Sequence, residues 1–175
     1  KDGYARVMLW FVLPLLAGTE MSGISTLTYR ATTVVLELLA GRLGLRVDAD
    51  RLRAIDIGAT PDSIPAWGDL LDGAPSIDVI GPASHLGAVS QAALMFREAP
   101  RLPAHACETA DWLHTAVYLA LPGHRAVLFP GSAADAEVID TVRRRGGEVI
   151  VLDEDPMVAS VTVDRLSLEL WRRAT

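Results

Sequence analysis

Two kinds of apolar pattern alternate along the second half of the chain. Short continuous apolar runs, typical of buried strands, lie at Ile77–Gly81, Arg125–Pro130 and Glu148–Leu152. Stretches with a 3.6-residue apolar period, typical of helices, lie at residues 84–98, 133–145 and 157–173. A short segment at 103–107 is compatible with a further strand, followed by a helix over 108–114. Strands separated by helices predict an α/β fold, with a parallel sheet covered by helices on both faces.

The first half of the chain follows a different order. Residues 7–16 are almost continuously apolar and predict a buried strand. Residues 22–43 predict a long helix, with Ser22 and Ser25 as candidate N-caps and Gly44 at the C-cap position. Residues 45–75 contain several prolines and aspartates and only short helical patterns. We therefore expect a linker there, carrying one or two short helices.

Length and charge exclude several classes of protein. The 175 residues are enough for one domain of average size, and the formal net charge is −6. Nucleic-acid binders and proteins of anionic membrane surfaces need a basic surface, so neither class is expected. The apolar run Val7–Leu16 is too short to span a bilayer, and Pro14 interrupts it. We expect no membrane partner.

Cysteine and lysine are both scarce. Cys107 is the single cysteine, so no intrachain disulfide can form, which fits a reducing cytoplasm. Lys1 is the only lysine among the sixteen basic residues. The sequence also starts with Lys1 rather than Met and enters an apolar run almost at once. We therefore expect a fragment, or a chain with residues missing from its start.

Two passages into helices are candidates for ligand binding. The loop Gly81–Gly87 lies between a strand and a helix, where free backbone N–H groups can bind an anion. Its Ser84 is expected either to cap the helix or to bind a phosphate oxygen. The segment Ser22–Thr26, which contains Ser25, has the same two interpretations. Because parallel sheets bind ligands at the carboxyl ends of their strands, we expect the loops after the strands to share one edge.

Glu98 and His114 are candidates for acid–base chemistry. Glu98 ends a largely apolar helix, and a carboxylate in a partly apolar pocket can transfer protons. His114 ends a short helical segment, and histidine titrates near neutral pH. A solvated helix end and a structural imidazole are the alternatives. The other histidines show no metal-site spacing, so we expect no metal.

Several stretches together resemble the sugar-isomerase (SIS) domain family. The family's helix, approximately Gly-Ala-Leu-Lys-Leu-Lys-Glu, corresponds to Ala92–Glu98 of this chain, which reads Ala-Ala-Leu-Met-Phe-Arg-Glu. The family's Leu-Lys-His-Gly-Pro corresponds to Trp112–Ala116, and the spacing from Glu98 to His114 agrees without a gap. Ser25 and Thr26, with the apolar helix after them, resemble the end of the family's first subdomain.

The resemblance implies a flavodoxin-like three-layer α/β/α fold that binds phosphorylated sugars without a cofactor. It implies three parts: the end of a first SIS subdomain at 1–44, a linker at 45–75 and a second subdomain at 76–175. In the isomerising members a glutamate moves a proton between C1 and C2, and a histidine assists ring opening, often across a dimer interface.

Carried over to this chain, the catalytic roles fall on Glu98 and His114, which we expect to face one cleft at the carboxyl edge of the sheet, from one subunit or across a two-fold axis. Ser25 and Thr26 match the loop that lines the sugar site, and Ser22 belongs to the same candidate segment. Because much of the chain is apolar, we expect a homodimer. The single cysteine fits a location in the cytoplasm.

Two departures from the family leave two hypotheses open. Met95 replaces the family's lysine three residues before the glutamate, and the tail with the family's Schiff-base lysine is missing. An imine needs a primary amine, so imine formation with a ketose is not expected. The first hypothesis is a phosphosugar isomerase acting on hexose or hexosamine phosphates without an imine. The second is a non-catalytic SIS domain that binds or senses sugar phosphates.

Overall fold

A computed structural model describes the chain except for residues 1–14, 16, 19–25, 58–60 and 175. The α-helices are α1 (Thr26–Arg42), α2 (Ala49–Ile57), α3 (Ile64–Leu71), α4 (Leu86–Glu98), α5 (Thr109–His114), α6 (Asp135–Arg144) and α7 (Pro156–Ala174). The strands are β1 (Ile77–Gly81), β2 (Ala104–Glu108), β3 (Arg125–Leu128) and β4 (Glu148–Val151). Two short 3₁₀ helices are η1 (Ala83–His85) and η2 (Ala116–Leu119).

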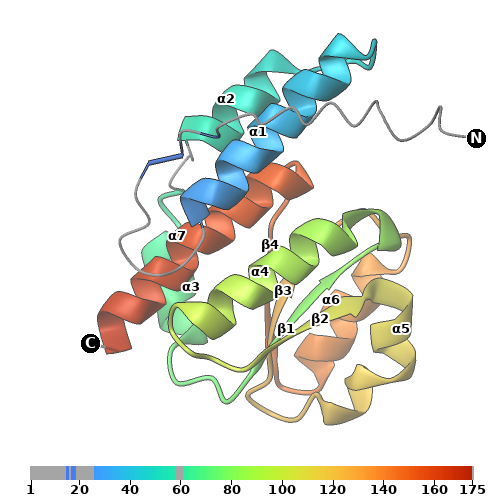
Figure 1. Cartoon of the computed structure of the whole chain (residues 1–175). Coiled ribbons are helices and arrows are strands. Elements are labelled where there is room, and N and C mark those ends of the chain that lie inside the picture. The colour runs from blue at the N-terminus through green and yellow to red at the C-terminus, as the bar shows by residue number, and fades with distance from the viewer. Residues whose placement is uncertain (1–14, 16, 19–25, 58–60, 175) are drawn as a thin grey trace, which may run out of the picture.

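The four strands form one parallel sheet in the order β2-β1-β3-β4 (Figure 1). Ile77 is paired with Ala104 on one side and with Arg125 on the other, so β1 lies at the centre. The strands predicted in the second half of the chain and their parallel pairing are confirmed. A parallel sheet requires its strands to be joined by crossovers, and helices supply them here.

Alternate residues of the strands face two different apolar clusters. Ile77, Val79 and Val127 belong to a large cluster that includes side chains from α3, α4 and α7. Ile80 and Leu128 belong to a second cluster, formed with α5, η2 and α6. Because successive strand side chains point to opposite faces, the two clusters lie on opposite sides of the sheet. The molecule is therefore the three-layer α/β/α arrangement that was expected.

The first two helices lie outside this sheet-and-helix core. α1 and α2 pack against each other and against α7, which is the element they share with the core (Figure 1). The side chain of Ile55 on α2 is 1% exposed and contacts the α7 residues Val158 and Val161. α3, in the segment expected to be a linker, contributes Ile64 and Leu71 to the large cluster. The segment 45–75 thus carries two short helices that both pack on α7.

Helix ends agree with the sequence in one place and differ in another. Gly44 follows α1 with a φ of +90°, a backbone conformation that favours glycine, and the predicted C-cap is confirmed. The predicted capping role of Ser84 is wrong, because His85 holds the N-cap position of α4 and Ser84 lies inside η1. The candidate caps Ser22 and Ser25, and the strand expected at 7–16 apart from Leu15, lie outside the described residues.

One polar cluster interrupts the second apolar cluster. Asp78 on β1 is 4% exposed, and its Oδ2 accepts a hydrogen bond of 2.8 Å from Trp112 Nε1. The same oxygen lies 3.2 Å from His124 Nε2, and Oδ1 lies 3.3 Å from His105 Nδ1. These contacts join β1, β2, α5 and the residue before β3. We call this group the Asp78 cluster.

Among the described residues, no helix is both long enough and apolar enough to cross a membrane.

Candidate functional site

A small cavity of about 200 Å³ lies between α1, α4 and α7. Apolar side chains and a tryptophan form most of its wall: Leu27, Met95, Ala99, Val161, Leu168 and Trp171. Its polar lining comes from Arg30, Asp164, Arg165 and Ser167. We refer to this cavity as the α1–α4–α7 pocket. A mostly apolar cavity with a few converging polar groups is the usual form of a small-molecule site.

The pocket lies where two sequence-predicted regions meet. Leu27 lines it directly after Thr26, the first residue of α1. Met95 and Ala99 line it on either side of Glu98, the last residue of α4. The fold thus brings the start of α1 and the end of α4 to one pocket, although they are about seventy residues apart in the sequence. The Glu98 side chain itself is exposed beside this lining.

The pocket does not lie at the carboxyl edge of the sheet. α4 starts after the carboxyl end of β1 and returns toward the amino end of β2, so Glu98 lies at the amino edge. His114 ends α5, which packs on the other face of the sheet through Trp112, and its side chain is exposed. The prediction that Glu98 and His114 face one cleft at the carboxyl edge is therefore wrong within a single chain.

At the carboxyl edge, the loop after β3 is held by the chain's own contacts. Asp135, at the start of α6, accepts hydrogen bonds from the backbone N–H groups of Gly131 at 2.6 Å and Ser132 at 2.9 Å. Those N–H groups are the donors that an anion would need, and a carboxylate already occupies them. Ser84 is exposed in η1, at this edge and away from the pocket. The structure does not bring Ser84 together with Glu98.

The ionisable groups of the pocket give it a positive balance. Arg30 is held by a hydrogen bond of 2.9 Å from its Nε to the Ile55 carbonyl, which fixes it between α1 and α2. With Arg165 and Asp164, the lining carries two guanidinium groups and one carboxylate. Guanidinium groups are the usual partners of phosphate oxygens in proteins, so this lining favours an anionic ligand.

Sequence reasoning missed the polar lining of the pocket. Arg30 is the only charged residue between Glu20 and Glu37, and a lone charge in such a long uncharged stretch is a signal that could have identified it. Ser167 and Trp171 carry no such signal, because α7 is a mixed helix of apolar and polar residues. Within the described part of the chain, no cluster of histidine, cysteine and acidic side chains could hold a metal ion.

Comparison with known proteins gives matches in structure only. No protein-family model matches the sequence, and no curated protein matches it either. Glucosamine-6-phosphate deaminase from Thermotoga maritima matches with a TM-score of 0.62 over 85% of this chain, at 12% identity. The C-terminal domain of glucosamine-fructose-6-phosphate aminotransferase from Francisella tularensis matches with a TM-score of 0.54, also over 85%, at 14% identity. The chain spans 50% of the first protein and 44% of the second. These matches show a SIS-like α/β fold for this chain.

Proposed function

We propose that the chain binds a phosphorylated sugar in the α1–α4–α7 pocket. The observation that carries this proposal is the meeting of the start of α1 with the end of α4 around that pocket. Both regions are those that the SIS resemblance assigns to the sugar site. Arg30 and Arg165 supply positive charge for a phosphate, and Trp171 supplies an aromatic face for a sugar ring. The two structural neighbours named above carry glucosamine 6-phosphate and fructose 6-phosphate in their names.

We propose that the active form is a phosphosugar isomerase, acting on a hexose or hexosamine phosphate. In this mechanism the carboxylate of Glu98 removes the proton from C2 of the open-chain aldose. The C1 carbonyl oxygen takes up a proton from water as the enediol forms. The C2 hydroxyl then releases a proton to water while Glu98 returns its proton to C1, which gives the ketose and restores the carboxylate. The exposed position of Glu98 beside the pocket leaves it accessible to a bound sugar. No lysine imine takes part.

His114 contributes in this proposal from a second copy of the chain. Within one chain it lies on the face of the sheet opposite to α4. A homodimer in which α5 of one subunit approaches the pocket of its partner supplies the acid–base group for ring opening. The site is then complete only in the dimer.

The non-catalytic hypothesis has an observation of its own. Met95, 1% exposed, lines the pocket at the position where the family has a lysine. The pocket thus keeps its arginines for a phosphate and replaces a charged residue near the reacting carbons by an apolar one. A domain that binds sugar phosphates as a sensor needs the arginines for the phosphate but no charged residue near the reacting carbons.

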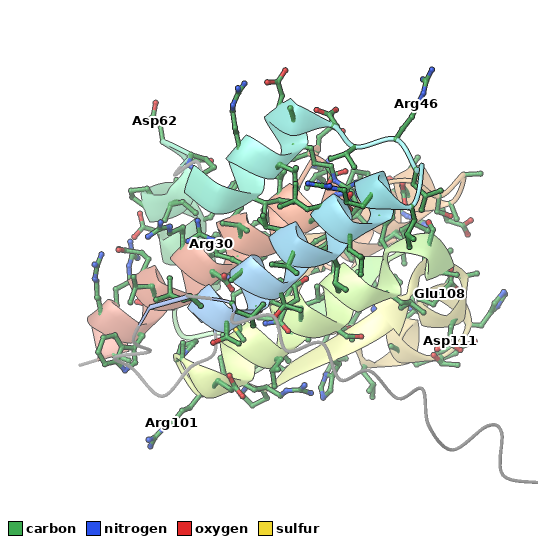
Figure 2. All side chains as sticks on the ribbon, turned by 45° about the horizontal axis from the view of Figure 1, so that its top comes forward. Arg30, Arg46, Asp62, Arg101, Glu108 and Asp111 are labelled. Carbon is green, nitrogen blue, oxygen red and sulfur yellow. The ribbon has the colours of Figure 1, made fainter. Side chains whose placement is uncertain are left out.

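Calorimetric titration with hexose and hexosamine 6-phosphates tests binding. Arg165→Ala should weaken binding about tenfold, because it removes one of the two cations that line the pocket. Arg46→Ala is the matched control, since Arg46 projects into solvent from the loop between α1 and α2 (Figure 2). Equal loss in both variants, or no binding by the unmodified protein, would count against the site.

An assay of aldose–ketose conversion tests catalysis. Glu98→Gln keeps the shape of the side chain and removes the base, so turnover should disappear while binding stays. His114→Ala should slow turnover of a cyclic sugar phosphate and spare an open-chain one. Undiminished turnover in Glu98→Gln would sink the catalytic role. Binding without turnover in the unmodified protein would favour the sensor.

A further inference from the structure

The α1–α4–α7 pocket is more apolar than a bare sugar phosphate requires. Met95 and Val161 at its wall are 1% and 2% exposed, and Leu168 and Leu27 extend the same surface. Hydroxyl groups of a sugar placed against this wall would lose their hydrogen bonds with water and gain none. A ligand that fits must present an apolar group to this side of the pocket.

A buried hydroxyl lies in the same lining. Ser167 on α7 is 1% exposed, and its Oγ has no hydrogen-bond partner among the described residues. A buried hydroxyl without a hydrogen-bond partner is unfavourable unless a ligand supplies that partner. A ligand group that joins a carbonyl oxygen to a small apolar group would fit here. Its oxygen would accept a hydrogen bond from Ser167 Oγ, and its apolar group would contact the wall.

The charges of the lining discriminate against an ammonium group. The lining carries two positive charges, on Arg30 and Arg165, and one negative charge, on Asp164, so it has one positive charge in excess. A free amino sugar is protonated near neutral pH and would bring a second cation next to these arginines. An acylated nitrogen is uncharged, and the phosphate remains the only charge to be bound.

The volume of the pocket limits the size of the ligand. Its 200 Å³ lie below the range of about 300–1,000 Å³ found for drug-sized ligands. A monosaccharide phosphate with a small substituent fits this volume better than a nucleotide sugar does.

We infer that the pocket selects an N-acylated amino-sugar phosphate over the free amino-sugar phosphate. The acyl methyl group contacts the wall formed by Met95, Val161 and Leu168, and the acyl oxygen accepts a hydrogen bond from Ser167 Oγ. This inference rests on the proposed function, because it concerns the ligand of the same pocket.

Three matched probes test this inference separately from the proposed binding of a sugar phosphate: N-acetylglucosamine 6-phosphate, glucosamine 6-phosphate and glucose 6-phosphate. Titration of the unmodified protein near pH 7 should give at least tenfold tighter binding for the acetylated probe than for the free amine. Equal or tighter binding of the free amine would overturn the selection and leave sugar-phosphate binding standing. Absence of binding by all three probes would overturn both.

The Ser167→Ala variant tests the hydrogen bond separately. It should weaken binding of the acetylated probe about fivefold and change binding of glucose 6-phosphate less than twofold. Ser90→Ala is the control, because Ser90 is exposed on α4 outside the pocket lining. An equal change for both probes in Ser167→Ala would contradict the assigned contact. The comparison of probes on the unmodified protein decides the selection even if this variant does not fold.

Discussion

Asp78 shows how much one buried carboxylate depends on its neighbours. Burial alone disfavours its charged form, but the contacts with His124, Trp112 and His105 outweigh burial and hold the pKa of Asp78 below its usual value. The folded protein therefore favours the carboxylate more than the unfolded chain does. This stabilisation is present above the pKa of an unfolded aspartate, about 4, and is lost as the pH falls through the lower folded pKa.

Asp78→Asn should lower the free energy of unfolding by about 2 kcal/mol at pH 7, because Trp112 and His124 lose a charged acceptor inside the protein. Urea denaturation measures the change. The difference from the unmodified protein should shrink as the pH falls from about 4 through the lower pKa of the folded Asp78 carboxylate. Asp62→Asn is the control, since Asp62 is exposed (Figure 2). A difference that does not depend on pH would contradict the assigned role of the charge.

Cys107 on β2 should be an unreactive thiol. Burial raises its pKa to about 12, and the carboxylates of Asp78 and Asp111 add to the effect. Compared with a thiol of pKa 9.0, the thiolate population near neutral pH is lower by roughly a thousandfold. Alkylation by iodoacetamide, followed by mass spectrometry, should be correspondingly slow in the folded protein and ordinary in urea. Rapid labelling of the folded protein would show that the thiol is accessible and ionised.

At the scale of elements, two glycines near α4 have opposite requirements. A Cβ at Gly81, the last residue of β1, would lie 2.7 Å from Val89 Cγ2 and 3.1 Å from Phe129 Cβ. A Cβ at Gly87, in the first turn of α4, would meet nothing within 4 Å. The first glycine is needed for close packing of β1 against its neighbours, whereas the second only lowers the helix propensity of α4.

Gly81→Ala should destabilise the protein by about 2 kcal/mol through overpacking. Gly87→Ala should stabilise it by about 0.5–1 kcal/mol, because alanine is the better helix former. Chemical denaturation of the two single variants measures both changes in the free energy of unfolding. The same substitution should lower it at residue 81 and raise it at residue 87. A tolerated alanine at residue 81 would mean that Val89 and Phe129 can move aside at little cost.

The sequence predicted elements better than it predicted their contacts. β1, β3 and β4 are short apolar runs because both of their faces are covered, and such runs are visible without a structure. α3 was not resolved as an element of the core, because Pro65 and Gly68 interrupt its helical pattern. The α1–α4–α7 pocket depends on three helices that are distant in sequence, and no local pattern records how helices pack. Glu98 was a candidate from its place at the end of an apolar helix, and the family motif added to that interpretation, whereas Arg30 was not identified.

At the scale of the whole molecule, α1 is apolar on two sides. Its inner side packs against α2 and α7, while Leu36, Leu38 and Leu39 on other sides are 58%, 52% and 47% exposed. A helix that is apolar around most of its circumference is normally buried. The proposed homodimer offers a partner for this surface.

Light scattering at micromolar concentration should therefore give the mass of a dimer. Leu38→Glu should shift the protein toward the monomer, because it places a charge in the middle of the exposed leucines. Leu121→Glu is the control, since Leu121 is 66% exposed in the loop before β3, away from α1. A monomer mass for the unmodified protein would contradict the dimer and, with it, the contribution of His114 from a partner.

The position of α7 has a consequence for how the protein folds during synthesis. α7 follows all four strands in the chain, yet its Ala159, Val163 and Leu166 complete the apolar cluster that α4 and β1 begin. While the ribosome is still translating the strands, the apolar face of α4 has no cover. That face remains a target for chaperones, or for a neighbouring nascent chain, until α7 has left the exit tunnel.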